Sequence, residues 1–320
     1  MPQNKIPPTY NTVQMVEIDD EYSSQRIDNF LVTYLKGVPK SLVYRILRKG
    51  EVRVNKGRIK PQYRLQTGDI VRIPPIRYDD AKNSPEIGEG LAKSLKSRIL
   101  FEDDYLIVLN KPAGLAVHGG SGVSYGVIEA LRSLYPEVKR LELVHRLDRA
   151  TSGCLILTKK AAALKVLHEH IRQDRIEKYF LALLKGQVSN SEGQIDLALR
   201  KFITKSGERM VVVDAEGKRS VSQYKVQQVF KDTTLVEYKL LTGRTHQLRV
   251  HSTAIGHPIC GDEKYGDVTF NNLIKRRGLK RMFLHARRLK FMHPVTNMVV
   301  DCNAPLDPDL SSLLKSLGEQ

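Results

Sequence analysis

One carboxylate stands between two arginines in residues 145–153, whose sequence is His-Arg-Leu-Asp-Arg-Ala-Thr-Ser-Gly. Asp148 has Arg146 and Arg149 as near neighbours, and a nearby positive charge favours the ionised form of a carboxyl group. An ionised aspartate can accept hydrogen bonds, pair with a cation or attack an electrophilic carbon. Structural ion pairs are common, so a salt-bridged loop aspartate is the more frequent meaning of this pattern. The residues alone leave a structural and a chemical role open.

Metal and nucleotide chemistry find little support elsewhere in the chain. His246 and His251 are five residues apart, which places them on opposite faces if the segment is a strand and is not a helical ligand spacing. The glycine-rich loop 118–122 matches neither a dinucleotide-binding nor a Walker pattern. We therefore expect no metal and no cofactor. Three widely spaced cysteines fit a reducing cytosol without disulfides, namely Cys154, Cys260 and Cys302.

The charge balance points to a polyanionic partner. The chain has 320 residues, enough for one large domain and a small one, and carries a formal net charge of +17. Such an excess favours nucleic acid before membrane, because no run of about 18 apolar residues is present to span a bilayer. Residues 1–20 show no secretory signal. We expect a cytoplasmic protein that binds nucleic acid and does not enter a membrane.

The N-terminal quarter predicts a mobile tail and then a small domain. Residues 1–22 are polar and form the predicted tail, with an edge strand at 13–18. In residues 23–76, apolar positions from Ile27 repeat at helical spacing, and a second helix follows from Ser41 with Gly50 at its end. An alternating pattern and an Asn-Lys-Gly turn then predict a small β element. Residues 77–97 lack a sustained apolar face and predict a linker.

Basic residues gather in two stretches. Residues 40–64 hold nine basic side chains against one acid, Glu51, and residues 268–300 hold eight basic side chains and no acid. A solvated face is the usual meaning of a charge run, but the overall charge favours RNA binding for both stretches. Five residues of the first stretch are the candidate RNA contacts, namely Arg45, Arg48, Lys49, Arg53 and Lys56.

Residues 98–320 predict one large α+β domain. Short β-like runs dominate, helices are few, and strands and helices do not alternate regularly. This order favours a mostly antiparallel or mixed sheet over a doubly wound parallel one.

Four separated motifs resemble the RluA-type pseudouridine synthases. They are Asn-Lys-Pro-x-Gly at 110–114, His-Arg-Leu-Asp-x-x-Thr-Ser-Gly at 145–153, a Lys-x-Tyr element read at 178–180 with Tyr179 as its tyrosine, and Gly-Arg-Thr-His-Gln-Leu-Arg at 243–249. The stretches 39–55 and 116–122 look like the RluC-type subgroup, which acts on bacterial large-subunit ribosomal RNA. Residues 26–73 also resemble the S4 RNA-binding domain. The resemblance implies a pseudouridine synthase fold preceded by an S4 domain.

What the resemblance implies is the isomerisation of specific uridines in 23S ribosomal RNA to pseudouridine. The bond between C1′ and N1 breaks, a bond between C1′ and C5 forms, and no cofactor is required. Asp148 would be the essential carboxylate on a flipped-out uridine, and Arg244 its cationic partner. Tyr179 would lie against the base and serve as the base in the final proton removal. Arg146 would insert where the uridine has left, and Leu284 would form a wall of the uracil pocket. We expect a monomer.

Several alternatives stay open. The enzyme could act on another RNA such as tRNA, or the chain could be a non-catalytic S4 assembly factor. An RNA glycosidase normally needs two carboxylates and a water, and Glu142 is a weak second acid. The sequence does not decide whether Asp148 attacks C1′, attacks C6 or abstracts the 2′ proton. It also does not identify the modified uridines.

Overall fold

The computed structural model describes residues 12–35, 38, 40–76, 89–119, 125–138, 140–204 and 207–319. The chain divides into two compact units, an N-terminal unit of residues 1–86 and a large unit of residues 87–320. Half of the predicted tail, the first half of the predicted linker and most of the glycine-rich loop lie outside the described residues.

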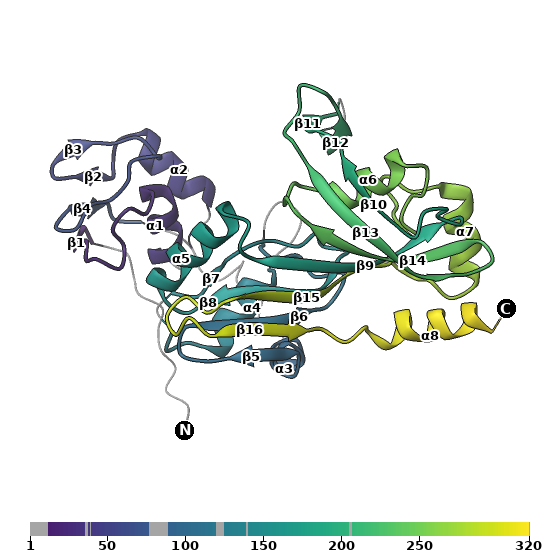
Figure 1. The fold of residues 1–320 in the computed structure, drawn as a ribbon. Coiled ribbons are helices and arrows are strands. Elements are labelled where there is room, and N and C mark those ends of the chain that lie inside the picture. The colour runs from purple at the N-terminus through teal and green to yellow at the C-terminus, as the bar shows by residue number, and fades with distance from the viewer. Residues whose placement is uncertain are drawn as a thin grey trace. The chain divides into compact units, whose positions relative to one another are not determined.

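The N-terminal unit is a four-stranded antiparallel sheet with two helices and a core of its own (Figure 1). The strand order is β1-β4-β2-β3, so β1 lies at an edge as predicted. Phe30 and Leu31 of the first helix and Leu47 of the second are fully or almost fully buried. The bounds are β1 (Gln14–Glu17), α1 (Ile27–Tyr34), α2 (Lys40–Arg48), β2 (Arg53–Val54), β3 (Gly57–Arg58) and β4 (Ile70–Ile73).

Local chemistry explains where these elements end. Gly50 has φ of 68°, the left-handed conformation expected just beyond a helix. Asn55 and Lys56 have φ of 48° and 68°, so both central residues of the β2–β3 turn are left-handed, as a tight hairpin requires. The sequence therefore predicted the two helices and the hairpin of this unit.

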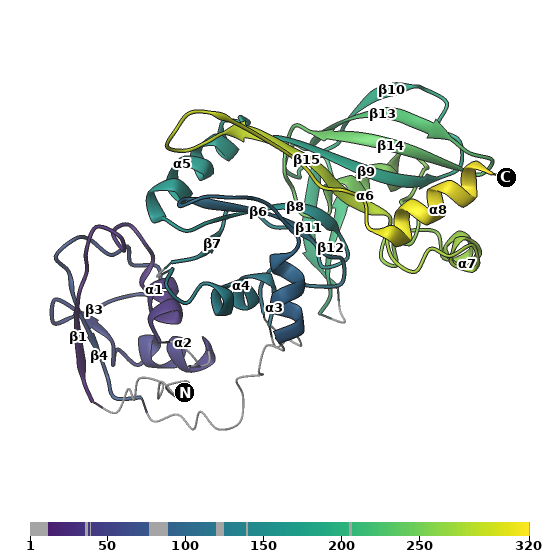
Figure 2. The same ribbon diagram turned by 90° about the horizontal axis from the view of Figure 1, so that it is seen from below.

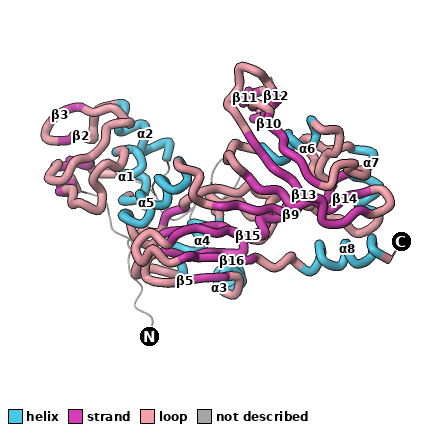
Figure 3. Tube along the Cα trace, in the orientation of Figure 1, coloured by secondary structure: helices cyan, strands magenta, loops and turns pink. Residues whose placement is uncertain are grey.

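The large unit is built on one ten-stranded sheet (Figures 1 and 3). Its main path runs β10-β13-β14-β9-β15-β8-β6-β5, with β16 beside β15 and β7 beside β8. These strands are β5 (Ile99–Glu102), β6 (Leu106–Lys111), β7 (Glu142–Leu143), β8 (Ser152–Thr158), β9 (Glu177–Lys185), β10 (Glu192–Asp196), β13 (Val221–Val229), β14 (Thr233–Leu240), β15 (Leu284–Met292) and β16 (Val299–Asn303). A separate antiparallel ribbon is formed by β11 (Leu199–Ile203) and β12 (Arg209–Val213).

The pairing confirms the predicted mixed sheet. β15 and β8 pair in parallel through Ser152 and Gly153 opposite His285 and Ala286, while the other pairs of described strands are antiparallel. Gly153 has φ of 108°, and a Cβ there would lie 2.2 Å from the carbonyl oxygen of Ala286. This close approach requires glycine. The last residue of the Asp148 motif thus allows the two strands to meet.

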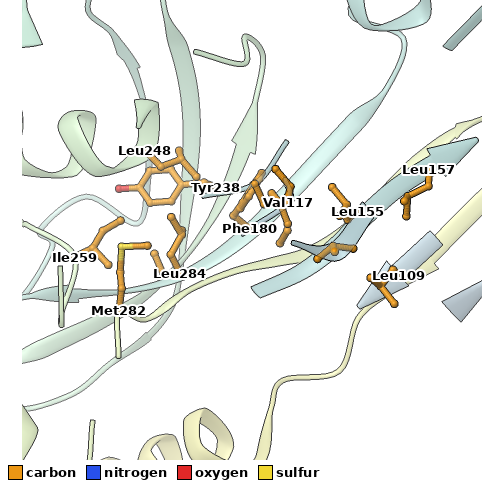
Figure 4. Close-up of a cluster of buried hydrophobic side chains, with 14 of the residues drawn as sticks. Leu109, Val117, Leu155, Leu157, Phe180, Tyr238, Leu248, Ile259, Met282 and Leu284 are labelled. Atoms are coloured by element: carbon orange, nitrogen blue, oxygen red, sulfur yellow. The ribbon is translucent and has the colours of Figure 1, made fainter. Parts of the chain in front are cut away.

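The helices of the large unit flank this sheet. They are α3 (Glu89–Lys96), α4 (Val127–Leu134), α5 (Ala161–Arg172), α6 (Gln247–Ala254), α7 (Val268–Arg276) and α8 (Pro308–Gly318). Figure 2 shows α3 and α4 beside each other. The largest buried cluster continues along the sheet from Leu109 and Leu157 to Tyr238 and Ile259 (Figure 4).

Two segments differ from the prediction. Residues 89–96, assigned to the linker, form the helix α3, because Ala92 and Leu95 recur at helical spacing and are buried. The segment between His246 and His251, interpreted as a strand, instead belongs to the start of the helix α6. The error at α6 has consequences for the site, since a helix and a strand present different residues to a pocket.

The basic stretch 268–300 is not a free cationic surface. Arg277 pairs with Asp232, and Arg281 pairs with Asp307 and Asp309. Two more acids, Glu237 and Asp301, pair with Arg287 and Arg288. The prediction of a second RNA-facing surface counted acids along the chain only. Folding brings acids from other elements to this stretch, so its net charge is much lower than its sequence indicates.

Candidate active site

A pocket of about 440 Å³ opens in the large unit beside the Asp148 motif. Its walls come from the loop before β8, the strands β9 and β15, and the start of α6. Apolar side chains form much of the lining, and Asp148 is the one carboxylate among the described lining residues. The apolar part includes Leu147, Phe180, Leu240, Leu248, Leu284 and Leu289.

The loop that carries Asp148 is fixed by a histidine. The backbone N–H of Ile156 in β8 donates to Nε2 of His145 at 3.1 Å, so the ring takes the place of a strand carbonyl. Burial lowers the pKa of His145 to about 3, which keeps the imidazole neutral and Nε2 free to accept. At the other end of the loop, the N–H of Thr151 donates to the carbonyl of Asp148 at 3.1 Å.

The Asn-Lys-Pro-x-Gly motif holds the same loop from the other side. Lys111 is fully buried, and its Nζ donates to the carbonyls of Pro112, Leu115 and Arg149 at 2.8, 2.9 and 3.3 Å. Gly114 donates its N–H to the carbonyl of Arg149 at 2.8 Å. Burial lowers the pKa of Lys111 to about 7. Two motifs separated in sequence are therefore joined next to the aspartate.

Asp148 is paired with Arg249, not with Arg244. Nη1 of Arg249 lies 3.1 Å from Oδ2 of Asp148, and Nε and Nη2 of Arg249 donate to the two oxygens of Asp262 at 2.7 and 2.8 Å. The exposed fractions of these side chains are 20% for Asp148, 11% for Arg249 and 1% for Asp262. Burial lowers the pKa of Arg249, but the two carboxylates outweigh it and hold that pKa above its ordinary value.

This pairing corrects the prediction for Arg244. Its side chain is exposed at the mouth of the pocket, and its Nε donates to the carbonyl of Arg219 at 3.3 Å. The physical reason is the helix α6, which begins at Gln247 and carries Arg249 inward in its first turn. The motif contains both arginines, and reading it as a strand hid which of them is buried.

The strand β9 places Phe180 rather than Tyr179 in the pocket. Lys178 and Phe180 line the cavity, as residues on one face of a strand should, and Tyr179 is not part of its lining. The hydroxyl of Tyr179 donates to Oε2 of Glu177 at 2.5 Å on the opposite face, and Lys239 stands over its ring. Tyr179 therefore has no access to the pocket through its own strand position, which corrects the prediction made from the Lys-x-Tyr reading.

Leu284 and Arg146 both line the pocket, and their predicted roles toward the RNA stay predictions. Leu284 is buried at the start of β15 and contributes to both the pocket wall and the core cluster drawn in Figure 4. Arg146 is exposed and lines the mouth of the pocket. Glu142 is held by Arg132 and Arg140 and is not among the described lining residues.

The chain is similar to known RNA-modifying enzymes over almost its whole length. A family model described as RNA pseudouridylate synthase matches residues 105–254, which include both Asp148 and Arg249. Ribosomal large subunit pseudouridine synthase C of Pasteurella multocida is 52% identical over 96% of this chain and 95% of its own length. The chain belongs to the RNA pseudouridylate synthase family. Its counterpart in Escherichia coli strain K12, with the same name, is 51% identical over 96% and 97% of the two chains.

Solved structures and a second family model agree with this assignment. Human RNA Pseudouridylate Synthase Domain Containing 4 covers 72% of this chain and 97% of its own, with 28% identity and a TM-score of 0.59. A model of the S4 domain matches residues 25–71, which confirms the predicted domain in the N-terminal unit. The synthase therefore combines an S4 domain with a pseudouridine synthase domain.

The S4 domain of this synthase presents its basic residues outward. Arg45 and Arg48 of α2, Lys49 after it, and Arg53 and Lys56 of the hairpin are all exposed. Within the described part of the domain, Lys49 is the one of these five in an ion pair, with Glu51 at 4.0 Å. Asp28 and Asp69 are instead engaged by side chains other than these five.

Four site residues of the synthase were missed by reasoning from sequence: Phe180, His246, Arg249 and Asp262. Phe180 could have been found from the apolar phase of its strand, and Arg249 from a helical reading of its motif. His246 has φ of 55° at the start of α6, and its Nε2 lies 3.7 Å from Oδ2 of Asp148. Asp262 is not at a spacing from Arg249 that predicts a contact, so no local sequence signal could have predicted their ion pair.

Proposed function

We propose that this synthase isomerises specific uridines of large-subunit (23S) ribosomal RNA to pseudouridine, with Asp148 as the essential carboxylate. The observation that carries the proposal is the pairing of Asp148 with Arg249 inside a largely apolar pocket. The relatives named above act, by their names, on the ribosomal large subunit. A family member with that degree of identity supports the same substrate class here.

The pocket suits a base that has left its stack. A uridine in folded RNA must be flipped out to reach Asp148, at a cost of a few kcal/mol. Phe180 and Leu284 supply flat and apolar surface for uracil, and Arg146 at the mouth can enter the place the base has left. Exposed cations of the S4 domain offset part of the cost by holding phosphates.

Arg249 orients the carboxylate in this proposal. The ion pair between Arg249 and Asp148 serves mainly to fix the position of the carboxylate. The bond between C1′ and N1 breaks, the base turns, and a bond between C1′ and C5 forms. N1 gains a proton and C5 loses one, so nothing is added overall. Attack at C1′, attack at C6 and abstraction of the 2′ proton are all compatible with one ionised oxygen in the pocket.

The proton at C5 is not removed by Tyr179 in this proposal. Tyr179 faces away from the pocket, and Phe180, which lines it, has no titratable group. Phe180 acts as a stacking surface alone. The enzyme works without a cofactor in this proposal, since isomerisation consumes no second reactant. It works in the cytoplasm as a monomer.

Release of tritium tests the reaction. The substrate is an in vitro transcript of 23S ribosomal RNA labelled at C5 of uridine, and the proposal expects tritium in water without free uracil. Asp148→Asn should abolish release while RNA affinity stays within about threefold, because a neutral amide of equal size keeps the pocket shape. Turnover retained by Asp148→Asn would refute the role of Asp148. Free uracil would indicate an RNA glycosidase.

Mapping of pseudouridine identifies the substrate. Ribosomal RNA from a strain that lacks this gene should lose pseudouridine at particular 23S positions and regain it on complementation. Loss from tRNA alone would place the substrate elsewhere. No loss, together with defective ribosome assembly, would favour a non-catalytic S4 factor.

A further inference from the structure

His246 occupies an unusual backbone position beside the carboxylate. It precedes α6 with φ of 55° and ψ of 18°, a left-handed conformation that is uncommon outside glycine and asparagine. Its side chain makes no capping hydrogen bond to the helix, so capping of the first turn of α6 does not explain why this residue is a histidine. The ring instead enters the pocket, with Nε2 3.7 Å from Oδ2 of Asp148. Strain of this kind persists where the surroundings enforce it, often at functional sites.

Tyr265 determines which nitrogen of His246 carries the proton. The hydroxyl of Tyr265 accepts from the N–H of Val211 at 3.0 Å and lies 2.7 Å from Nδ1 of His246. Burial raises the pKa of Tyr265, so the phenol keeps its own proton. Nδ1 is the acceptor within reach of that proton among the described contacts of Tyr265. A neutral His246 then carries its hydrogen on Nε2, the nitrogen that faces Asp148.

The surroundings favour the neutral ring. Burial lowers the pKa of His246, against the opposite influence of Asp148, and the cation Arg249 lowers it further. Tyr265 also contacts Arg249, whose guanidinium lies 5.0 Å from the ring centroid. One tyrosine thus supports both groups that approach Asp148.

We propose that His246 is a positioning residue of the isomerisation, donating from Nε2 to Oδ2 of Asp148 and leaving Oδ1 as the reacting oxygen. Both polar groups that approach Asp148, Arg249 and His246, do so at Oδ2 among the described contacts. The 3.7 Å separation shortens into a hydrogen bond when substrate fills the pocket, as happens with long contacts in substrate-free sites. This inference rests on the proposed role of Asp148.

Two replacements of His246 separate positioning from a merely structural role. Glutamine places an amide N–H near the position of Nε2 and can still donate to Asp148, whereas asparagine reaches only the position of Nδ1. Asparagine is the better residue for a left-handed backbone. Positioning therefore expects His246→Gln to outperform His246→Asn, and a structural role expects the reverse order.

The measurement is the single-turnover rate of tritium release from the labelled 23S transcript, beside the dissociation constant for the same RNA. His246→Asn should slow the rate about tenfold or more, as misplacement of a reacting group does, with RNA affinity unchanged. His246→Gln should stay within about threefold of wild type, and Tyr265→Phe should fall between them. An asparagine variant as fast as the glutamine variant would overturn the inference.

Two further variants make failure interpretable. His257→Asn makes the same change beyond the end of α6, where Nδ1 contacts the carbonyl of Lys185 at 2.9 Å and the ring is outside the pocket lining. Its rate should equal that of wild type, and a comparable loss there would refute a specific role for His246. Asp148→Asn tests the underlying proposal separately. If it stays active the role of Asp148 fails, and if it is inactive while both His246 variants match wild type only the present inference fails.

Discussion

The pocket and the S4 surface use cations in opposite ways. In the pocket, Arg249 is almost buried and contacts two carboxylates. Beside it, the buried Lys111 donates to three backbone carbonyls and so holds the loop that carries Asp148. On the S4 domain, Arg45, Arg53 and Lys56 are exposed and, among the described residues, are in no ion pair with an acid. The same residue types therefore fix internal geometry in one region and remain available to an outside polyanion in the other.

The two regions differ in what remains in the protein when a cation is removed. A buried guanidinium leaves uncompensated carboxylates behind, which is costly for the fold. Removal of an exposed guanidinium leaves no unpaired group behind, so the fold is unaffected. Only the long-range attraction for a polyanion falls. Changes in the pocket should thus alter rate and stability, while changes on the S4 domain should alter affinity and its salt dependence.

Replacement of Arg249 should have the largest effect. Arg249→Met removes the partner of Asp148 and leaves Asp262 buried without its counter-charge, so we expect about 3–5 kcal/mol lower stability and a single-turnover rate reduced about a hundredfold or more. Urea unfolding and tritium release measure the two quantities. Arg249→Lys keeps a charge but not the bidentate geometry, and should recover stability more than rate.

Arg244→Met is the matched control for that prediction. Arg244 lies in the same motif, five residues earlier, and its side chain is exposed. Its loss should leave the unfolding free energy within about 0.5 kcal/mol of wild type. A larger rate loss at Arg244 than at Arg249 would restore Arg244 as the partner of the carboxylate.

Local patterns predicted much of the fold and part of the site. Helical spacing from Ile27 and the Asn55-Lys56-Gly57 turn are local signals, and the structure confirms both elements. The prediction that Asp148 is the central residue of the site rested on the length of its motif, not on the residues that surround it. The predictions failed for properties that depend on a distant partner. The burial of Arg249 depends on Asp262, and the charge of the 268–300 stretch is lowered by acids such as Asp232.

Neutralising the S4 cations should reduce affinity and leave the rate intact. Changing Arg45, Arg53 and Lys56 together to Gln should weaken binding to the 23S transcript about ten- to a hundredfold at moderate salt, because fewer counterions are released. The slope of the logarithm of affinity against the logarithm of salt concentration should become shallower by at least about one. The single-turnover rate at saturating enzyme should equal that of wild type.

A control with the same loss of charge uses lysines of the large unit. Lys225, Lys231 and Lys315 form no ion pair among the described residues and lie outside the pocket lining. Their triple change to Gln should leave the salt slope nearly unchanged. An equal weakening in both triple variants would mean that net charge, not the S4 surface, attracts the RNA.

His145 should make the pocket region sensitive to acid. Its folded pKa of about 3 lies below the unfolded value of about 6.5, so the unfolded state binds more protons between these pH values. Stability from the neutral ring is then present above pH 6.5 and is lost as the pH falls towards 3.

His145→Gln keeps an acceptor for Ile156 but cannot titrate. The difference in unfolding free energy between the two proteins should change by about 1–2 kcal/mol from pH 7 to pH 5. A constant difference would show that His145 does not titrate on unfolding.

Tyr179→Phe should have the smallest effect of all. The variant removes only the hydroxyl that donates to Glu177 at 2.5 Å on the face of β9 away from the pocket. Lys239 still pairs with Glu177 at 3.1 Å, so the acid keeps a partner and stability should fall by no more than about 1 kcal/mol. Because the C5 proton would leave by another route, the single-turnover rate should stay within about twofold of wild type.

Phe180→Leu, the neighbouring change on the pocket face, should slow the reaction by removing a stacking surface worth about 1–3 kcal/mol per base. A strong loss of rate in Tyr179→Phe with Phe180→Leu unaffected would show that the face of the strand turned toward the RNA is the one that carries the tyrosine.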